Sequence, residues 1–135
     1  STAAKFATPG VNIGLFCSTP MVAISRNLSN KHSMEMLLLG ELISSEKAAK
    51  IGLINEVSHD DKFKEFVLNK ALKISKKSAI TLKIGKQAFY KQIDMKLSEA
   101  YNYASKVMVQ NMLKLDAKEG IDAFINKREP KWKDK

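Results

Sequence analysis

Cysteine and histidine are scarce in this sequence, and their scarcity excludes several kinds of site. The single cysteine, Cys17, rules out an internal disulfide and a zinc site built from several cysteines. The two histidines, His32 and His59, are isolated, so we interpret both as structural or exposed rather than as metal ligands. The sequence also has no glycine-rich phosphate loop, no H-E-x-x-H motif and no nucleophile elbow. No metal site is therefore predicted.

Long apolar runs are absent as well. No stretch approaches the roughly 20 apolar residues of a membrane-spanning helix, and no signal peptide is visible. The 135 residues, 44% of them hydrophobic and 27% charged, are ordinary for a soluble globular protein. A chain of this length hides roughly two thirds of its unfolded surface when it folds. We therefore predict a chain that can bury a core and has no membrane span.

Acidic residues are few wherever lysines gather. Residues 62–91 hold nine lysines and one acid, Glu65, and the last ten residues hold five basic side chains against Glu129 and Asp134. Such runs are usually solvated helical faces, and a surface lysine gains only about 1 kcal/mol from a nearby phosphate. Aromatic residues make up 7% of the chain and do not alternate with the lysines. A basic helical module that binds nucleic acid is therefore a remote alternative, and we predict no nucleic-acid partner.

Capping signals predict a first pair of helices. Ser29 or Asn30 can cap a helix over Lys31–Leu39, which Gly40 would end, and the "GELIS" stretch that follows is typical of a turn. A shorter helix is predicted to start after Ser44. It would end near residue 50, with a left-handed glycine at position 52.

One short strand is predicted after these helices. The stretch "LINEVS", Leu53–Ser58, has the β-branched and apolar content of a strand. A lone short strand is not stable without a neighbour, so it either pairs with the opening of the chain or joins a sheet elsewhere. The whole sequence predicts about six helices and one or two short strands.

Helical periodicity dominates the second half. Asp60 and Asp61 favour a helix start, and Ser78 opens a further helix that runs to about Gln92. The first of these helices is predicted to bury one face, formed by Phe63, Phe66, Val67, Ala71 and Ile74. From residue 94 the strongest stripe follows, formed by Leu97, Ala100, Tyr101, Ala104, Met108, Met112 and Leu115. That stripe is most simply core, or a helix-packing interface.

The last predicted helix carries its own signals. Asp116 and Glu119 form a D-x-x-E capping pair at its start, and Pro130 would end it. The residues of its apolar side are Ile121, Phe124 and Ile125.

The opening of the chain, "KFATPGVNIGLFCSTP", is typical of a strand that turns into a helix at Pro9-Gly10. Ser18 or Thr19 can cap that helix, with a proline at position 20 in its first turn. Cys17 lies beside this helix start, where a thiol can become nucleophilic, but no histidine or asparagine partner stands nearby. We interpret Cys17 as a small packing residue.

Three blocks of the sequence resemble the enoyl-CoA hydratase/isomerase family of the crotonase superfamily. The blocks are "KFATPGVNIGL", "MEMLLLGELISSEKAAKIGLINEV" and "EGIDAFINKREPKW", in the family's order and spacing. The stretches "FATPGVNIGLFCSTP" and "QAFYKQ" resemble one particular group within this family.

The resemblance implies the C-terminal portion of a crotonase-like (ClpP/crotonase) α/β fold, mostly helical here. Residues 1–58 would form the end of the crotonase core and the pocket wall. Residues 59–135 would form a C-terminal helical region for trimerisation and for covering CoA. Family members are roughly twice this length, so an N-terminal half is expected upstream of Ser1. The stripe of Leu97–Leu115 would then contact another subunit, in a trimer or a dimer of trimers.

The resemblance also implies a chemistry. Family members polarise a thioester carbonyl with an oxyanion hole of two backbone N–H groups, and hydratases add two glutamates. The oxyanion donors and the first glutamate would come from the upstream half. The second glutamate follows the proline of an F-x-x-P-E motif, which here reads Phe6 to Gly10. We therefore expect that this chain supplies no catalytic residue and that the isolated half is inactive. We also expect weak hydratase activity in the intact protein.

The family's CoA contacts have counterparts near the C-terminus. In the family's AF-x-x-KR motif an aromatic residue and a lysine contact the nucleotide part of CoA, which implies Phe124 and Lys127 here. Met108 stands where hydratases have a further aromatic residue. The alternatives are a core role for Phe124 and a solvated role for Lys127. Trp132 is interpreted as a packing residue or interface anchor.

The predicted function is an acyl-CoA-handling protein of this family, in fatty-acid metabolism. Its substrate pocket would be lined by Pro9, Gly10, Gly14 and Phe16, and a CoA thioester would be substrate or ligand, with no permanently bound cofactor. The alternative is a non-catalytic acyl-CoA-binding or assembly subunit. The expected location is the cytoplasm of a bacterium or the mitochondrial matrix of a eukaryote.

Overall fold

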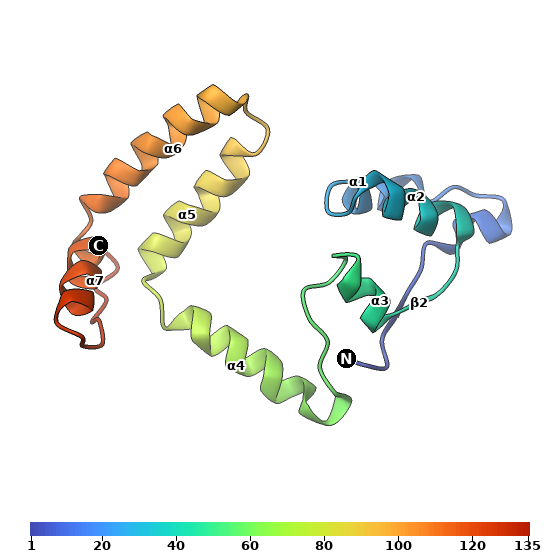
Figure 1. Ribbon diagram of the computed structural model, residues 1–135, viewed down its shortest axis with the longest axis horizontal. Coiled ribbons are helices and arrows are strands. Elements are labelled where there is room, and N and C mark those ends of the chain that lie inside the picture. Colours follow the sequence, from blue (N-terminus) through green and yellow to red (C-terminus); the bar gives the residue numbers. More distant parts are fainter. The chain divides into compact units, whose positions relative to one another are not determined.

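The computed structural model describes residues 1–135, which divide into two compact units, Ser1–Leu68 and Asn69–Lys135 (Figure 1). It contains seven α-helices, two short 3-10 helices and one two-stranded sheet, slightly more helices than predicted. No helix has both the length and the apolar composition to cross a membrane.

The first unit packs short elements around a small apolar cluster. Its elements in chain order are β1 (Lys5–Phe6), η1 (Pro9–Ile13), α1 (Ser18–Ser25), α2 (Asn30–Leu39), β2 (Ile43–Ser44), α3 (Ser45–Lys50) and η2 (Asp60–Lys62). Helices α1 and α2 lie side by side (Figure 1). The buried cluster consists of Ile24, Leu28, Met36, Ile43 and Ala48. Helices α1, α2 and α3 and strand β2 contribute to this cluster, and the partly buried Phe6 of β1 packs against it, so one core fixes their positions.

The capping residues place the helix ends as predicted. Ser29 caps α2 by accepting a hydrogen bond from the His32 N–H, and Gly40 ends that helix with a φ of 60°. Ser44 caps α3 in the same way, and Gly52 has a φ of 85°. Left-handed backbone favours glycine because it has no Cβ.

The strand prediction was wrong for two segments of the chain. Ile43–Ser44, which was expected to form a turn, is strand β2 and pairs antiparallel with β1. Leu53–Ser58, which was expected to be a strand, has no regular structure. The backbone N–H groups of Leu53 and Ile54 bond to the Ala48 carbonyl instead, and their side chains pack on the core cluster. Strand β1 pairs only with β2, and the opening of the chain meets residues 53–58 through a single backbone bond, from the Thr2 N–H to the Ser58 carbonyl at 2.9 Å.

The second unit is a group of mutually packed helices. Helix α4 (Phe63–Ser75) crosses the boundary between the units and leads to α5 (Ala79–Gln92), α6 (Leu97–Met112) and α7 (Leu115–Ile125). Helices α5 and α6 run side by side, and α7 packs against both (Figure 1). The Ser78 hydroxyl caps α5 by accepting from the Thr81 N–H, as predicted.

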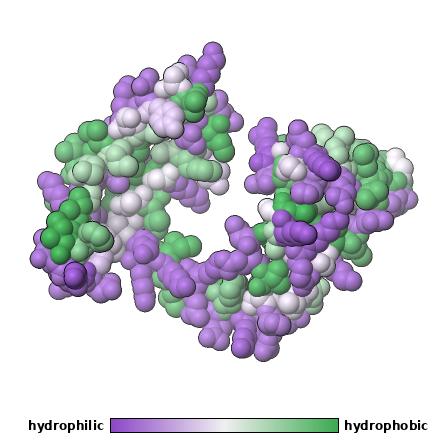
Figure 2. Space-filling model, viewed as in Figure 1, coloured by the Kyte–Doolittle hydropathy of each residue, from purple (hydrophilic) through white to green (hydrophobic).

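The apolar faces of α4, predicted as buried, and of α6, predicted as core or a helix-packing interface, are mostly exposed in this chain. Tyr101 and Met108 of the α6 stripe are 69% and 61% exposed, whereas Tyr103 and Val107, on another side of α6, are half-buried. The predicted buried face of α4 is also exposed, apart from the half-buried Phe66. Figure 2 shows apolar side chains, in green, on the visible surface of the molecule. Periodicity identified the apolar faces, but it does not report which face a neighbouring helix covers.

Candidate functional site

The loop from Pro9 to Cys17 is closed by its own backbone. Pro9 occupies the first turn of η1, where a missing N–H costs nothing. The Leu15 N–H donates to the Gly10 carbonyl at 2.9 Å, and Gly14 reverses the chain with a φ of 75°. Helix α1 then begins at Ser18 with Cys17 as its N-cap, so the predicted capping role of Ser18 or Thr19 was wrong. The loop and the start of α1 are thus one compact turn.

Gly10 lies where the loop leaves no room for a side chain. A Cβ atom at this position would lie 2.6 Å from the Leu15 carbonyl oxygen and 2.8 Å from the Cys17 sulfur. The Gly10 N–H donates to that sulfur at 3.3 Å. Cys17 is half-buried and forms this packing contact, which agrees with its interpretation as a packing residue. The sequence alone gave no sign that position 10 is closed to every side chain.

Two side-chain hydrogen bonds fix this loop to α2. The buried Thr8 hydroxyl donates to the Met36 carbonyl at 2.7 Å, and the Asn12 amide donates to the Gly40 carbonyl at 3.1 Å. The Val11 side chain fills the space beside Gly40, where a Cβ would approach it to 2.8 Å. The loop is therefore held at both the middle and the end of α2.

The four predicted pocket residues lie on this one loop. Pro9, Gly14 and Phe16 are exposed, and Gly10 is half-buried. Ile13 and Leu15 are exposed beside them, which gives the loop an apolar surface that the prediction did not include.

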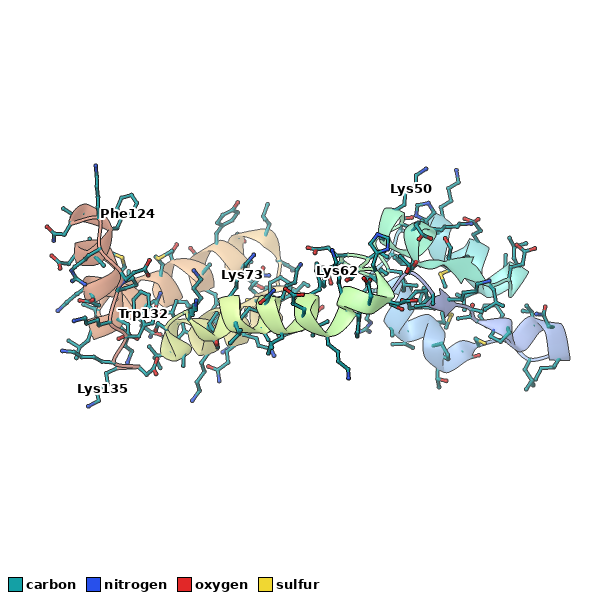
Figure 3. All side chains as sticks on the ribbon, turned by 90° about the horizontal axis from the view of Figure 1, so that it is seen from below. Lys50, Lys62, Lys73, Phe124, Trp132 and Lys135 are labelled. Atoms are coloured by element: carbon teal, nitrogen blue, oxygen red, sulfur yellow. The ribbon has the colours of Figure 1, made fainter.

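Phe124 and Lys127 lie at the C-terminal end of α7, in the second unit. Phe124 is 85% exposed, so no other part of this chain buries it as a core residue. Within the second unit, Phe124 and the C-terminal Lys135 lie on opposite sides, with Trp132 between them (Figure 3). The Phe124 and Lys127 pair belongs to the second unit, whereas the Pro9–Phe16 loop belongs to the first.

Lys127 has an unusual backbone conformation, with a φ of 51°. It occupies the left-handed position after α7, where the Arg128 N–H donates to the Ala123 carbonyl and the Lys127 N–H to the Phe124 carbonyl. Glycine is the common residue at this position of such a helix end, and another residue costs about 1 kcal/mol or more. A lysine here is a backbone outlier that the sequence did not reveal.

Both neighbours of Lys127 are tied back to α7. The Asn126 amide donates to the carbonyl and to the carboxylate of Asp122. The Arg128 guanidinium donates to both oxygens of Glu119, at 2.6 and 3.0 Å, and also to the Asp122 carboxylate. None of these ion pairs involves the exposed Lys127 ammonium group.

The pairing of Glu119 with Arg128 changes both side chains electrostatically. The Arg128 hydrogen bonds and the Lys131 N–H lower the pKa of Glu119 to about 2. Those bonds to Glu119 and Asp122 raise the pKa of Arg128 above its ordinary value. Both groups are therefore charged throughout the physiological pH range.

Asp116 and Glu119 do not form the predicted capping pair. Asp116 is buried and accepts from the N–H groups of Lys133 and Asp134, at 2.7 and 3.1 Å. Glu119 accepts from the Lys131 N–H at 2.7 Å. Burial raises the pKa of Asp116, but hydrogen bonds from the Ser78 hydroxyl and the two N–H groups lower it by more. The pKa of Asp116 therefore lies below its ordinary value. The carboxylates bind the C-terminal residues because the chain folds back along α7.

Trp132 completes this fold-back. Its indole N–H donates to the Lys76 carbonyl at 2.8 Å, and its ring lies 3.3 Å from where a Cβ on Gly120 would stand. Trp132 is thus a packing residue, as interpreted. A cavity of about 410 Å³ lies beside it, lined also by Thr81, Asn111 and Phe124.

Neither unit contains a group of three or more His, Cys, Asp or Glu side chains that could hold a metal ion. Sequence reasoning missed the ion pair between Glu119 and Arg128. They are nine residues apart on either side of a helix end, and helix pairing rules cover only spacings of three and four.

The family model of the enoyl-CoA hydratase/isomerase family matches residues 1–135. The mitochondrial enoyl-CoA hydratase domain-containing protein 3 of Rattus norvegicus is 47% identical over 132 residues, which are 98% of this chain and 44% of that protein. The mitochondrial enoyl-CoA hydratase of Pongo abelii is 29% identical over 132 residues, 97% of this chain and 46% of that protein. The chain thus spans about half the length of the curated relatives that it matches.

Solved structures give the same result for the fold. The crystal structure of human enoyl Coenzyme A hydratase domain-containing protein 3 matches with a TM-score of 0.92 and 44% identity, over 97% of this chain and 52% of that one. The enoyl-CoA hydratase of Mycobacterium smegmatis matches with a TM-score of 0.93 and 40% identity, over 97% and 51%.

The structure is therefore part of a crotonase fold, as predicted. The chain belongs to the enoyl-CoA hydratase/isomerase family. The group within the family that the opening stretch resembled is the enoyl-CoA hydratase domain-containing protein 3 group, and the comparisons confirm that resemblance.

Proposed function

We propose that this chain is part of an acyl-CoA-binding protein in which hydration is weak, because Gly10 stands at the position of a catalytic carboxylate. The packing at Gly10 supports this proposal most directly. A side-chain carbon there would lie 2.6 Å from the Leu15 carbonyl oxygen, so the loop is built for glycine. The family acts on CoA thioesters without a permanent cofactor, and an acyl-CoA is the proposed ligand.

The size of the catalytic loss follows from general magnitudes. A positioned general acid or base contributes ~10²–10⁴-fold, while each oxyanion donor contributes about 10²–10³-fold. The proposed oxyanion donors belong to the part of the family fold that this chain does not include. Loss of the carboxylate would slow hydration strongly, but it would leave binding and any reaction that needs only a stabilised enolate.

Phe124 and Lys127 are proposed to contact the nucleotide part of CoA. Both are exposed at the same end of α7, where an aromatic face can stack on a base and an ammonium group can pair with a phosphate. The left-handed backbone of Lys127 supports a role for its side chain, because glycine would fit that position with less strain.

A non-catalytic acyl-CoA-binding or assembly subunit is the second candidate function. The exposed apolar stripe of α6 favours it, since Tyr101 and Met108 present apolar surface with no partner in the chain. We propose that this stripe contacts another copy, in a trimer or a dimer of trimers. A mitochondrial location for a eukaryotic protein is proposed because the relatives in rat and human are named mitochondrial.

Calorimetry with CoA and crotonyl-CoA tests the binding part of the proposal. We expect both ligands to bind, and Lys127→Ala to weaken both equally, because it removes a contact to their shared nucleotide end. Lys118→Ala is the matched control, since Lys118 is an exposed lysine on the same helix. Equal losses in the two variants would show a general charge effect and would contradict the assigned contact.

Hydration of crotonyl-CoA by the longer protein that contains this chain tests the catalytic part. We expect the wild type to bind crotonyl-CoA but to hydrate it slowly. Gly10→Glu alone is expected to gain little, because the new side chain collides with the loop. Gly10→Glu with Cys17→Gly, which removes one of the two collisions, is expected to gain more. Rapid hydration by the wild type, or no gain in either variant, would show that Gly10 does not limit turnover.

A further inference from the structure

We propose that Glu119 and Trp132 are positioning residues, which clasp residues 128–135 onto the helices and thereby hold the Lys127 side chain in place. This inference rests on the proposed function, in which Lys127 contacts CoA. The segment 128–135 is called the C-terminal clasp below. Its contacts all lie within the second unit.

The clasp is anchored along most of its length. Glu119 holds Arg128 and the Lys131 N–H, and Asp116 holds the N–H groups of two further residues, at positions 133 and 134. Trp132 holds the middle through its bond to the Lys76 carbonyl and its contact with the face of α7 at Gly120.

The far end of the clasp reaches the start of α5. The Asp134 carboxylate accepts from the Ala79 N–H at 2.7 Å, which satisfies one of the free N–H groups at that helix end. The clasp therefore links α7 to α5. A segment fixed at both of its ends and in its middle cannot shift without breaking several bonds.

Lys127 lies at the point where this clasp begins. Its left-handed backbone is unfavourable for a lysine, so the surrounding contacts must impose it. Asn126 on one side and Arg128 on the other are both bonded to α7, while the Lys127 side chain is exposed. Release of Arg128 would let the turn return to an ordinary backbone conformation. The Lys127 side chain would then point in a different direction.

Glu119→Gln is the main test, because it keeps the shape of the side chain and removes its charge. We expect it to weaken CoA binding about threefold to tenfold, as measured by calorimetry. In a Lys127→Ala background the same substitution is expected to cause no further loss. An equal loss in both backgrounds would show that Glu119 does not act through Lys127, and would overturn the proposal. Glu99→Gln, at an exposed acid on α6, is the control and should change nothing.

A second readout does not depend on CoA. The three-bond coupling between the amide and α protons of Lys127 reports its φ in solution. We expect wild type to show left-handed values and Glu119→Gln to shift them. If the coupling shifts but neither protein binds CoA, the clasp stands and the proposed function fails. If the coupling does not shift, the positioning role fails.

Trp132→Phe provides a milder variant in case Glu119→Gln unfolds the unit. It keeps an aromatic side chain, removes the donor to the Lys76 carbonyl and shortens the ring edge that contacts Gly120. We expect the same changes in coupling and in CoA affinity, smaller in size. A normal coupling in this variant together with weakened CoA binding would overturn the positioning role of Trp132.

Discussion

The α-carbon of Gly10 faces the Leu15 carbonyl so closely that an added Cβ would lie 2.6 Å from its oxygen. The Leu15 N–H in turn donates to the Gly10 carbonyl at 2.9 Å, so the two residues fix each other across the loop. We propose that position 10 corresponds to a catalytic carboxylate. In this chain the Leu15 backbone occupies the space that a side chain at position 10 would need. A side chain at this position would require a different loop conformation.

Gly10→Ala is expected to destabilise the chain by about 1–3 kcal/mol, which is typical of overpacking. The new methyl group would displace a backbone carbonyl, which yields less readily than a flexible side chain. Urea unfolding followed by circular dichroism measures the change.

Gly85→Ala is the matched control for this substitution. Gly85 lies within α5, and a Cβ there would meet no atom within 4 Å. Alanine in a helix interior is favoured over glycine, so this variant should be more stable by roughly 0.5–1 kcal/mol. If Gly10→Ala proved as stable as Gly85→Ala, the loop would have room for a Cβ atom, and the packing argument at Gly10 would fail.

Local signals were predicted well from the sequence because they need only neighbouring residues. Ser29, Ser44 and Ser78 each cap the helix that was expected to follow them. Such a cap involves an N–H group only three residues away. The family blocks likewise identified the fold, because they carry a whole pattern of residues.

Features that join distant residues could not be predicted. Ile43–Ser44 is a strand only because β1, far away in the sequence, pairs with it. The Glu119 carboxylate binds the C-terminal clasp only because the chain turns back at Lys127. The exposure of Tyr101 depends on which face of α6 meets α5, which periodicity does not specify.

The stability of the C-terminal clasp should fall in acid. Glu119 has a pKa of about 2 in the folded chain, against an ordinary value of 4.5. A carboxylate with a lowered folded pKa contributes stability above its unfolded pKa, and this contribution is lost as the pH falls toward the folded value. The loss is therefore expected between about pH 4.5 and pH 2.

Trp132 fluorescence measures this loss, because Trp132 is the single tryptophan of the chain and lies within the clasp. Urea midpoints at neutral pH, pH 4 and pH 3 should decrease in wild type. Glu119→Gln should lower the midpoint at neutral pH and show a weaker pH dependence, since it has no carboxylate to protonate. The Asp116 contribution, also from a lowered pKa, should remain in that variant. Identical pH profiles for the two proteins would contradict the assignment to Glu119.

Lys127→Gly should separate stability from binding. Glycine accepts the left-handed backbone without strain, so we expect the variant to be more stable by about 1 kcal/mol in urea. The same variant loses the ammonium group and should bind CoA more weakly than wild type in calorimetry. Lys127→Ala is the comparison, because it loses the same group but keeps the strain. A variant with gained stability and unchanged CoA affinity would show that the lysine is tolerated there without being used.

Met108→Glu tests the proposed self-association through the α6 stripe. Met108 is 61% exposed, and a contact with another copy would bury it with Tyr101 and the other stripe residues. A buried unpaired carboxylate is costly, so the variant should sediment as a smaller species than wild type at equal concentration. Gln110→Glu adds the same charge at another exposed position of α6 and should leave the association unchanged. If both variants associate like wild type, the contact between copies lies on a different face, because a charge at the centre of an apolar interface would weaken association.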